Sequence, residues 1–358
     1  MNADSDGSEA SSLDARTNDP VIRHDPLSQR TVFVAPRRAA RPSELNTTAT
    51  SLDQCPFCAG HEHLTPPDLL RSESEPGVWH ARIVPNRYPV VEDWFVQDRA
   101  TPRDEAAADS FARGSHDVVV EAADHLRSIL SIPSNRWLAV WRLVRERLGA
   151  LSMREDLAWA TIFKNSGRAA GASLEHVHSQ IVALDFVPPV LDTEWQASTT
   201  TAGSFAALLM KAADDDLIVA ESGDLVAMVP PAPRQPLECW ILPRHPEPRF
   251  HRTSDDAVVA LAHLTRWFVS RLDRLVPDAA YNWWLHDAPF EHPRQTGRRR
   301  PGATETSDAQ PGGSGSTPWH WHLEILPRLT SFAGFEFATG CHVTTLSARE
   351  IARLLREA

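Results

Sequence analysis

Residues 171–182 read Gly-Ala-Ser-Leu-Glu-His-Val-His-Ser-Gln-Ile-Val, with two histidines and a glutamine at every second position. A β-strand sends alternate side chains to opposite faces. His176, His178 and Gln180 are therefore predicted to project from one side of a strand over 174–184. A lone strand histidine is usually an ordinary buried residue, but three buried polar groups on one face need partners. The pattern favours a functional site.

The segment before this strand is a loop of small residues, Asn165-Ser-Gly-Arg-Ala-Ala-Gly171. Glycine lets the backbone approach a ligand closely, and successive N–H groups form anion-binding concavities. The loop is predicted to bind a phosphate group, although a plain glycine turn has the same pattern.

A second motif is Cys55-Pro-Phe-Cys58, in a chain with four cysteines. Such a pair is half of a zinc site or a redox pair. The redox alternative expects the motif to open a helix, but glycine and prolines follow it closely. Zinc, which takes four nitrogen or sulfur ligands in a tetrahedron, is favoured. His125 and His176 are distant candidate ligands, so the expected site is a tertiary one.

Together these motifs resemble the galactose-1-phosphate uridylyltransferase family of the histidine-triad superfamily. The pattern is Cys-x-x-Cys, then Asn-x-Gly-x-x-x-Gly-x-Ser-x-x-His-x-His-x-Gln. Further segments resemble the family at residues 25–42, 82–89 and 319–327, so the resemblance covers most of the chain from about residue 21 onward.

The resemblance implies roles for the matching residues. His178 matches the nucleophile, and Gln180 matches the amide that supports the transferring phosphoryl group. The matched zinc ligands are Cys55, Cys58, His125 and His176; a closed set of four implies a mainly structural zinc. The matched substrate positions are Asn165, Gly171 and Ser173 in the phosphate loop, with Arg38, Arg41 and Asn86 on the nucleotide side.

A second transition metal, iron or zinc, is also implied. Three histidines and a carboxylate suit several such metals; the matched residues are Glu194, His286, His320 and His322.

The stretch His320-Trp-His-Leu-Glu324 repeats the period of His176-Val-His-Ser-Gln180. This predicts two related histidine-triad-like halves. Glu324 stands where Gln180 stands, and a carboxylate repels a phosphoryl group, so the second half is predicted to have lost catalysis.

The expected reaction moves a nucleoside monophosphate from a nucleotide sugar to His178 and then to a hexose 1-phosphate, as UDP-glucose:hexose-1-phosphate uridylyltransferases do. The family pattern usually has proline where this chain has Val177, and residues 174–184 with Pro188-Pro189 look closer to the branch containing plant-type ADP-glucose phosphorylase. Phosphate is therefore an alternative acceptor. Hydrolysis and a non-catalytic zinc nucleotide-binding regulator are further alternatives, but the intact His178 and Gln180 favour an enzyme.

The length of 358 residues favours two domains. They are expected at 21–195, with catalysis and zinc, and at 196–358, with a disordered tail at 1–20 and a disordered insertion at 291–318. The formal charge of −11 argues against nucleic-acid binding. Few cysteines, no spanning apolar run and no signal peptide predict a cytoplasmic enzyme without a membrane partner. A homodimer is one expected assembly.

The expected fold class is α+β with mainly antiparallel sheets and a duplicated architecture. Helices are predicted from a Ser134 cap to about Leu151, from Ser254 to about Leu275, and from about Ser347. Strands are predicted over 31–35, 118–121, 157–163, 174–184, 237–242 and 319–326.

Overall fold

A computed structural model describes residues 19–25, 30–40, 55–93, 109–200, 204–291 and 319–358. The expected tail, as far as residue 18, and the expected insertion, from residue 292 on, lie outside this part of the chain. Arg41 also lies outside it.

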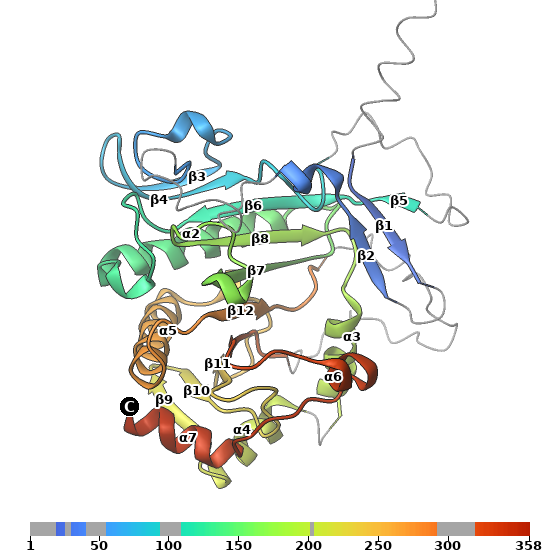
Figure 1. Cartoon of the computed structure of the whole chain (residues 1–358), viewed down its shortest axis with the longest axis vertical. Coiled ribbons are helices and arrows are strands. Elements are labelled where there is room, and N and C mark those ends of the chain that lie inside the picture. The colour runs from blue at the N-terminus through green and yellow to red at the C-terminus, as the bar shows by residue number, and fades with distance from the viewer. Residues whose placement is uncertain (1–18, 26–29, 41–54, 94–108, 201–203, 292–318) are drawn as a thin grey trace, which may run out of the picture.

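A ten-stranded sheet forms the centre of the molecule, and each neighbouring pair in it is antiparallel (Figure 1). This confirms the α+β class with mainly antiparallel strands. In spatial order the strands are β3 (Leu70–Glu75), β4 (Val78–Pro85), β6 (Gly114–Val120), β8 (His178–Leu184), β7 (Trp159–Ser166), β12 (Tyr281–His286), β13 (His322–Pro327), β11 (Cys239–Pro243), β10 (Leu225–Met228) and β9 (Ile218–Ser222). A separate three-stranded sheet has the order β2 (Thr31–Val34), β1 (Val21–His24) and β5 (Asp109–Phe111).

The pairing registers relate the two halves of the large sheet. Phe163 of β7 pairs with Gln180 of β8, and Trp284 of β12 pairs with Glu324 of β13. Phe163 and Trp284 also pair with each other. A local two-fold axis therefore passes between these two residues and superposes β8 on β13. Because one sheet and one hydrophobic core run through both halves, the domain boundary at residue 195 stays a prediction.

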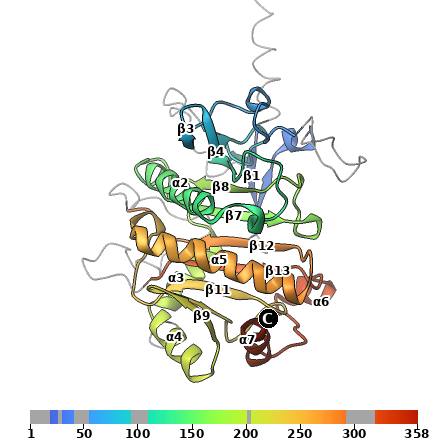
Figure 2. The ribbon, with the colours of Figure 1, turned by 90° about the vertical axis from the view of Figure 1, so that its left-hand side faces the viewer.

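Two long helices, α2 (Ser134–Ser152) and α5 (Asp255–Leu275), cover one face of this sheet and pack against each other (Figure 2). The Ser254 hydroxyl caps α5 by accepting a hydrogen bond from Ala257 N at 3.2 Å, as an N-cap serine does. The other α-helices of the described residues are α3 (Pro189–Ser198), α4 (Phe205–Asp214), α6 (Gly334–Thr339) and α7 (Ala348–Glu357). Among the described residues, no helix is long and apolar enough to cross a membrane.

Several predicted boundaries differ from the structure. The strand predicted from residue 174 begins at His178, because the preceding residues form a loop that carries His176 toward the cysteines. The strand predicted from 237 begins at Cys239, since Leu237 has a φ of +63°. The strand predicted from 319 begins at His322. Pro133, not Ser134, is the N-cap of α2, because the fixed φ of proline suits a helix start.

Candidate functional site

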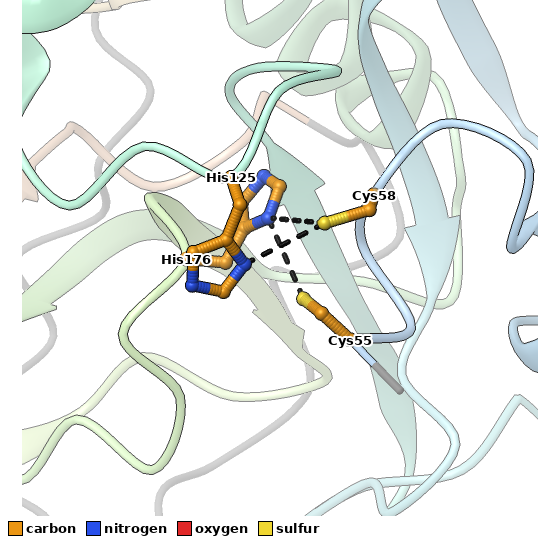
Figure 3. A group of neighbouring side chains, drawn as sticks. All are labelled: Cys55, Cys58, His125 and His176. Atoms are coloured by element: carbon orange, nitrogen blue, oxygen red, sulfur yellow. Dashed lines mark hydrogen bonds between the residues drawn. The ribbon is translucent and has the colours of Figure 1, made fainter. Parts of the chain in front are cut away.

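Two cysteines and two histidines from three distant segments converge at one point (Figure 3). The Cys55 Sγ lies 3.5 Å from His176 Nδ1, and the Cys58 Sγ lies 3.5 Å from His125 Nδ1 and 3.6 Å from His176 Nδ1. The four ligand atoms all lie within 4.8 Å of one another.

These distances fit a zinc tetrahedron. Bonds of 2.0–2.3 Å to nitrogen and sulfur place ligand atoms roughly 3.3–3.8 Å apart. The His176 Nε2–H donates to Ala122 O at 2.9 Å, which leaves Nδ1 unprotonated, as zinc ligation requires. Burial lowers the pKa of His176 to about 4, so its ring is neutral near pH 7. Burial and the neighbouring Cys55 raise the pKa of Cys58 to about 12.

The cysteine turn is also fixed by packing. Phe57 is buried and its ring lies 5.9 Å from that of His176 and 5.3 Å from that of His178, centroid to centroid. The fully buried Arg82 on β4 donates to Pro56 O at 3.2 Å. A metal ion in this cluster would therefore support the His178 ring through Phe57.

His178 is the first residue of β8, and its side chain is 5% exposed. Its Nδ1 lies 2.8 Å from His176 O. A carbonyl can only accept, so Nδ1 carries a proton, and in the neutral ring the unprotonated nitrogen is Nε2. A neutral imidazole with Nε2 unprotonated is a competent nucleophile.

Gln180 lies on the same face of β8, and its orientation follows from its neighbours. Tyr88 N donates to Asn86 Oδ1 at 2.8 Å, so the Asn86 amide nitrogen faces Gln180 Oε1, at 3.3 Å. Val90 N donates to His116 Nδ1 at 3.0 Å, so His116 Nε2–H is the donor to Gln180 Oε1, also at 3.0 Å. With its oxygen accepting from both neighbours, Gln180 offers its NH₂ group as a hydrogen-bond donor.

His116 was missed by the sequence reasoning, which predicted a strand over 118–121. The strand β6 begins at Gly114 and pairs His116 with Val182, on the face that Gln180 shares. The alternate positions His116, Val118 and Val120 could have indicated that the strand begins earlier and that His116 lies on the same face as the two valines.

The loop between β7 and β8 has positive φ at two glycines, +82° at Gly167 and +83° at Gly171, and Gly171 is in the left-handed helical conformation. Asn282 of the second half donates to Asn165 Oδ1 at 2.8 Å and to Ala170 O at 2.9 Å. The N–H groups of residues 170–172 donate within the loop, so these three donors are already used by loop carbonyls. Ser173 lies in the same loop. Arg38, half-buried, donates to Tyr88 O at 2.8 Å.

The structure brings together three of the four residues predicted for a second metal site. His286, His322 and Glu194 converge, and Glu324 joins them, whereas His320 is not in this group and its Nδ1 donates to Pro243 O at 2.8 Å. His286 Nδ1 lies 2.9 Å from Glu194 Oε2 and 3.3 Å from Glu324 Oε1. The Glu194 Oε2, His286 Nδ1 and His322 Nε2 atoms are buried without a well-aligned hydrogen bond. Imidazole nitrogens and carboxylate oxygens that converge in a buried site without well-aligned hydrogen bonds fit a cation.

A cavity of about 580 Å³ lies between α2 and α5, lined in part by Leu138 and Trp267. These helices cover the opposite face of the sheet from the His178 side chain, so this cavity does not serve the site.

Known proteins are similar to this chain in sequence and in fold. Residues 11–188 match the family described as "Galactose-1-phosphate uridyl transferase, N-terminal domain". The ADP-glucose phosphorylase of Arabidopsis thaliana is 27% identical over 345 residues, covering 94% of this chain and 93% of that protein. The galactose-1-phosphate uridylyltransferase of Haemophilus influenzae is 26% identical, covering 76% and 80%. The crystal structure of the Arabidopsis thaliana ADP-glucose phosphorylase with bound ADP-glucose matches with a TM-score of 0.70 and 27% identity, covering 95% of this chain and 99% of that one.

Proposed function

Because this chain belongs to the galactose-1-phosphate uridylyltransferase family and is an enzyme of the nucleotidyltransferase kind, we propose that it moves a nucleoside monophosphate from a nucleotide sugar through His178 to a hexose 1-phosphate. The observation that carries this proposal is the His178 imidazole, whose proton sits on Nδ1 against His176 O. With Nδ1 protonated, Nε2 is the nitrogen that carries the lone pair in the neutral ring, as a histidine nucleophile requires.

In the first step the Nε2 lone pair attacks the α-phosphorus of the donor. The bond from that phosphorus to the bridging oxygen breaks, and the sugar 1-phosphate leaves with the electron pair. In the second step an oxygen of the acceptor phosphate attacks the nucleotidyl-histidine, and Nε2 recovers its lone pair.

Gln180 is proposed to donate its NH₂ group to an equatorial oxygen as charge develops. Asn86 and His116 hold the amide in this orientation, and a preorganised donor stabilises the transition state without reorganisation. Asn165, Gly171 and Ser173 are proposed to shape the phosphate loop, and Arg38 and Arg41 to lie on the nucleotide side.

Cys55, Cys58, His125 and His176 are proposed to hold zinc, which would supply a structural cross-link. The cysteine turn itself places Phe57 against the His178 ring. Glu194, His286, His322 and Glu324 are proposed as a second site for iron or zinc, with His320 left outside it. A cytoplasmic location and a homodimer stay predictions from the sequence.

Inorganic phosphate is a second candidate acceptor, which would make the enzyme a nucleotide-sugar phosphorylase. The 27% identity to the Arabidopsis thaliana ADP-glucose phosphorylase over 94% of this chain supports this alternative. The two candidates share the first step and differ in the acceptor.

The test offers UDP-glucose and ADP-glucose, each labelled in the α-phosphate, with galactose 1-phosphate, phosphate or no acceptor. Donor alone is expected to label His178, and His178→Ala is expected to lose the label and the transfer while keeping its zinc. Label on another residue, or undiminished transfer by folded His178→Ala protein, would refute the role of His178.

A further inference from the structure

A buried ionic network lies directly behind the nucleophile. The Lys164 Nζ on β7 donates to Glu121 Oε2 at 2.5 Å and to His178 O at 2.9 Å. The other oxygen of Glu121 accepts from Ser179 Oγ at 2.5 Å. The side chains of Lys164 and Glu121 are 2% and 0% exposed. The network therefore joins the residue after β6, the end of β7 and the start of β8.

The network lies on the helix-covered face of the sheet, opposite the His178 side chain. Ser179 is adjacent to His178 in β8 and so points to the other face. Ile181, which shares the Ser179 face, packs in the core cluster with residues of α2. The Lys164 side chain thus reaches His178 through its backbone carbonyl, not through its ring.

The pairing of β7 with β8 ends at Phe163 and Gln180. Lys164 follows Phe163 directly, and its ammonium group bonds the carbonyl of His178, two residues before Gln180. The side chain therefore extends the link between the two strands to the residue that carries the nucleophile.

The second half of the sheet provides an internal comparison. The two-fold relation that equates Gln180 with Glu324 equates Lys164 with Leu285 and Ser179 with Leu323. On the outer side, Val118 pairs with Gln180 and Trp240 pairs with Glu324, so Glu121 corresponds to Pro243. Leu285 and Leu323 are fully buried in the core. The second half lacks the histidine–glutamine arrangement of His178 and Gln180. It has apolar residues at the three positions that correspond to Lys164, Ser179 and Glu121.

This contrast argues that the fold does not need the charges. Taking a lysine and a glutamate out of water carries a large desolvation penalty, and well-packed apolar residues are often at least as stabilising. The second half builds the same strands with leucine and proline. The ionic network is therefore better explained by what it does to His178.

We propose that Lys164, Glu121 and Ser179 are positioning residues that fix the backbone of His178, so that Nε2 points at the α-phosphorus. This inference rests on the proposed function. Lys164 holds the carbonyl of His178 from one face while His176 O holds the ring Nδ1. A shift of about 1 Å in a reacting group can cost about 100-fold in rate.

The main variant is the double substitution Lys164→Met with Glu121→Gln, because removing one partner alone leaves a buried unpaired charge. We expect its single-turnover rate of His178 nucleotidylation to fall about 10- to 100-fold, with donor affinity changed less than about threefold. Ser179→Ala, a milder change, is expected to lower the same rate by a smaller factor. Both variants are compared with wild type by thermal unfolding and zinc content.

The matched control is Arg147→Met with Asp117→Asn, which removes another ion pair of the same half, with 15% and 2% exposed side chains. This control is expected to change stability but not the rate of nucleotidylation. A second test uses His178→Gly protein rescued by free imidazole, which is not tethered to the strand. Adding Lys164→Met and Glu121→Gln to it should leave the rescued rate unchanged.

The outcomes separate the two proposals. If wild type forms no nucleotidyl-His178 adduct, the proposed function fails. If wild type forms the adduct and the folded double variant forms it equally fast, the positioning role is wrong. An equal rate loss in the imidazole-rescued background would also overturn it, because the network would then act on something other than His178. If the double variant does not fold, an unchanged rate in Ser179→Ala refutes the proposal and a lowered rate supports it.

Discussion

Replacing Cys58 by serine tests directly whether Cys55, Cys58, His125 and His176 hold zinc. The change removes one of four ligands whose atoms lie within 4.8 Å of one another and leaves the backbone of the cysteine turn intact. We expect Cys58→Ser protein to be purified with little zinc and to unfold at a lower temperature, because metal bound to the folded state adds to its stability.

The size of the effect follows from the linkage between binding and folding. A ligand present at about 1,000 times its dissociation constant stabilises the folded state by about 4 kcal/mol. For a chain of this length, 1 kcal/mol shifts the unfolding midpoint by about 2 °C, so the expected shift is about 8 °C. Phe57 and the Arg82–Pro56 bond remain in the variant. These contacts hold the cysteine turn in place, so the shift in midpoint reports the lost metal and not a lost contact of the turn.

The assay measures zinc by elemental analysis and unfolding by calorimetry, with and without chelator. Cys239→Ser is the matched control, since Cys239 is a fully buried cysteine of the second half outside the cluster. It is expected to lose about 1–3 kcal/mol from burying a hydroxyl group, with its zinc content and its chelator sensitivity unchanged. Purified wild-type protein that is metal-free, folded and indifferent to chelator would refute the zinc assignment.

Other predictions concern the second half, the pH dependence and the phosphate loop. His322→Ala is expected to keep His178 nucleotidylation, because we propose a structural role for the second cluster; a folded variant without transfer would contradict this. Burial, with Arg252 and Arg249, lowers the pKa of His251 to about 4. As the pH drops from about 6.5 to 4, His251 therefore takes up a proton in the unfolded chain before it does in the folded protein, and stability falls. His251→Gln should show a weaker fall in urea midpoint over that window than wild type. Gly171→Ala should cost about 1–2 kcal/mol through its left-handed φ of +83° alone, since a Cβ there meets nothing within 4 Å; no change in urea midpoint would argue against the strained turn.

Much of the fold could be predicted from local sequence signals. The cap at Ser254 and the antiparallel character follow from side-chain chemistry and strand periodicity. The short strands β9 and β10 carry no alternation strong enough to distinguish them. The start of β8 could not be predicted either, because the chain before His178 follows the cysteine cluster, which is a tertiary constraint.

The candidate site could likewise be predicted only in part. The ligand set Cys55, Cys58, His125 and His176 came from motif resemblance, and the structure brings the four together. The second cluster contains Glu324 and not the predicted His320. This could not be foreseen from the sequence, because the His320 ring is held by the backbone carbonyl of Pro243. His116 was missed because its partner Gln180 is 64 residues away in the sequence.

The two halves show how one strand pattern can serve two kinds of chemistry. Gln180 has its oxygen occupied by Asn86 and His116, which leaves a donor for an anionic phosphoryl group. Glu324, at the equivalent position, has only acceptors, and Arg234 takes one of its oxygens while the other faces His286 and His322. A carboxylate with two imidazoles attracts a cation and repels a phosphate. The exchange of one amide for one carboxylate therefore agrees with the proposed nucleotidyl transfer in the first half and the proposed metal site in the second. The ionic network behind His178 has its counterpart in apolar residues of the second half.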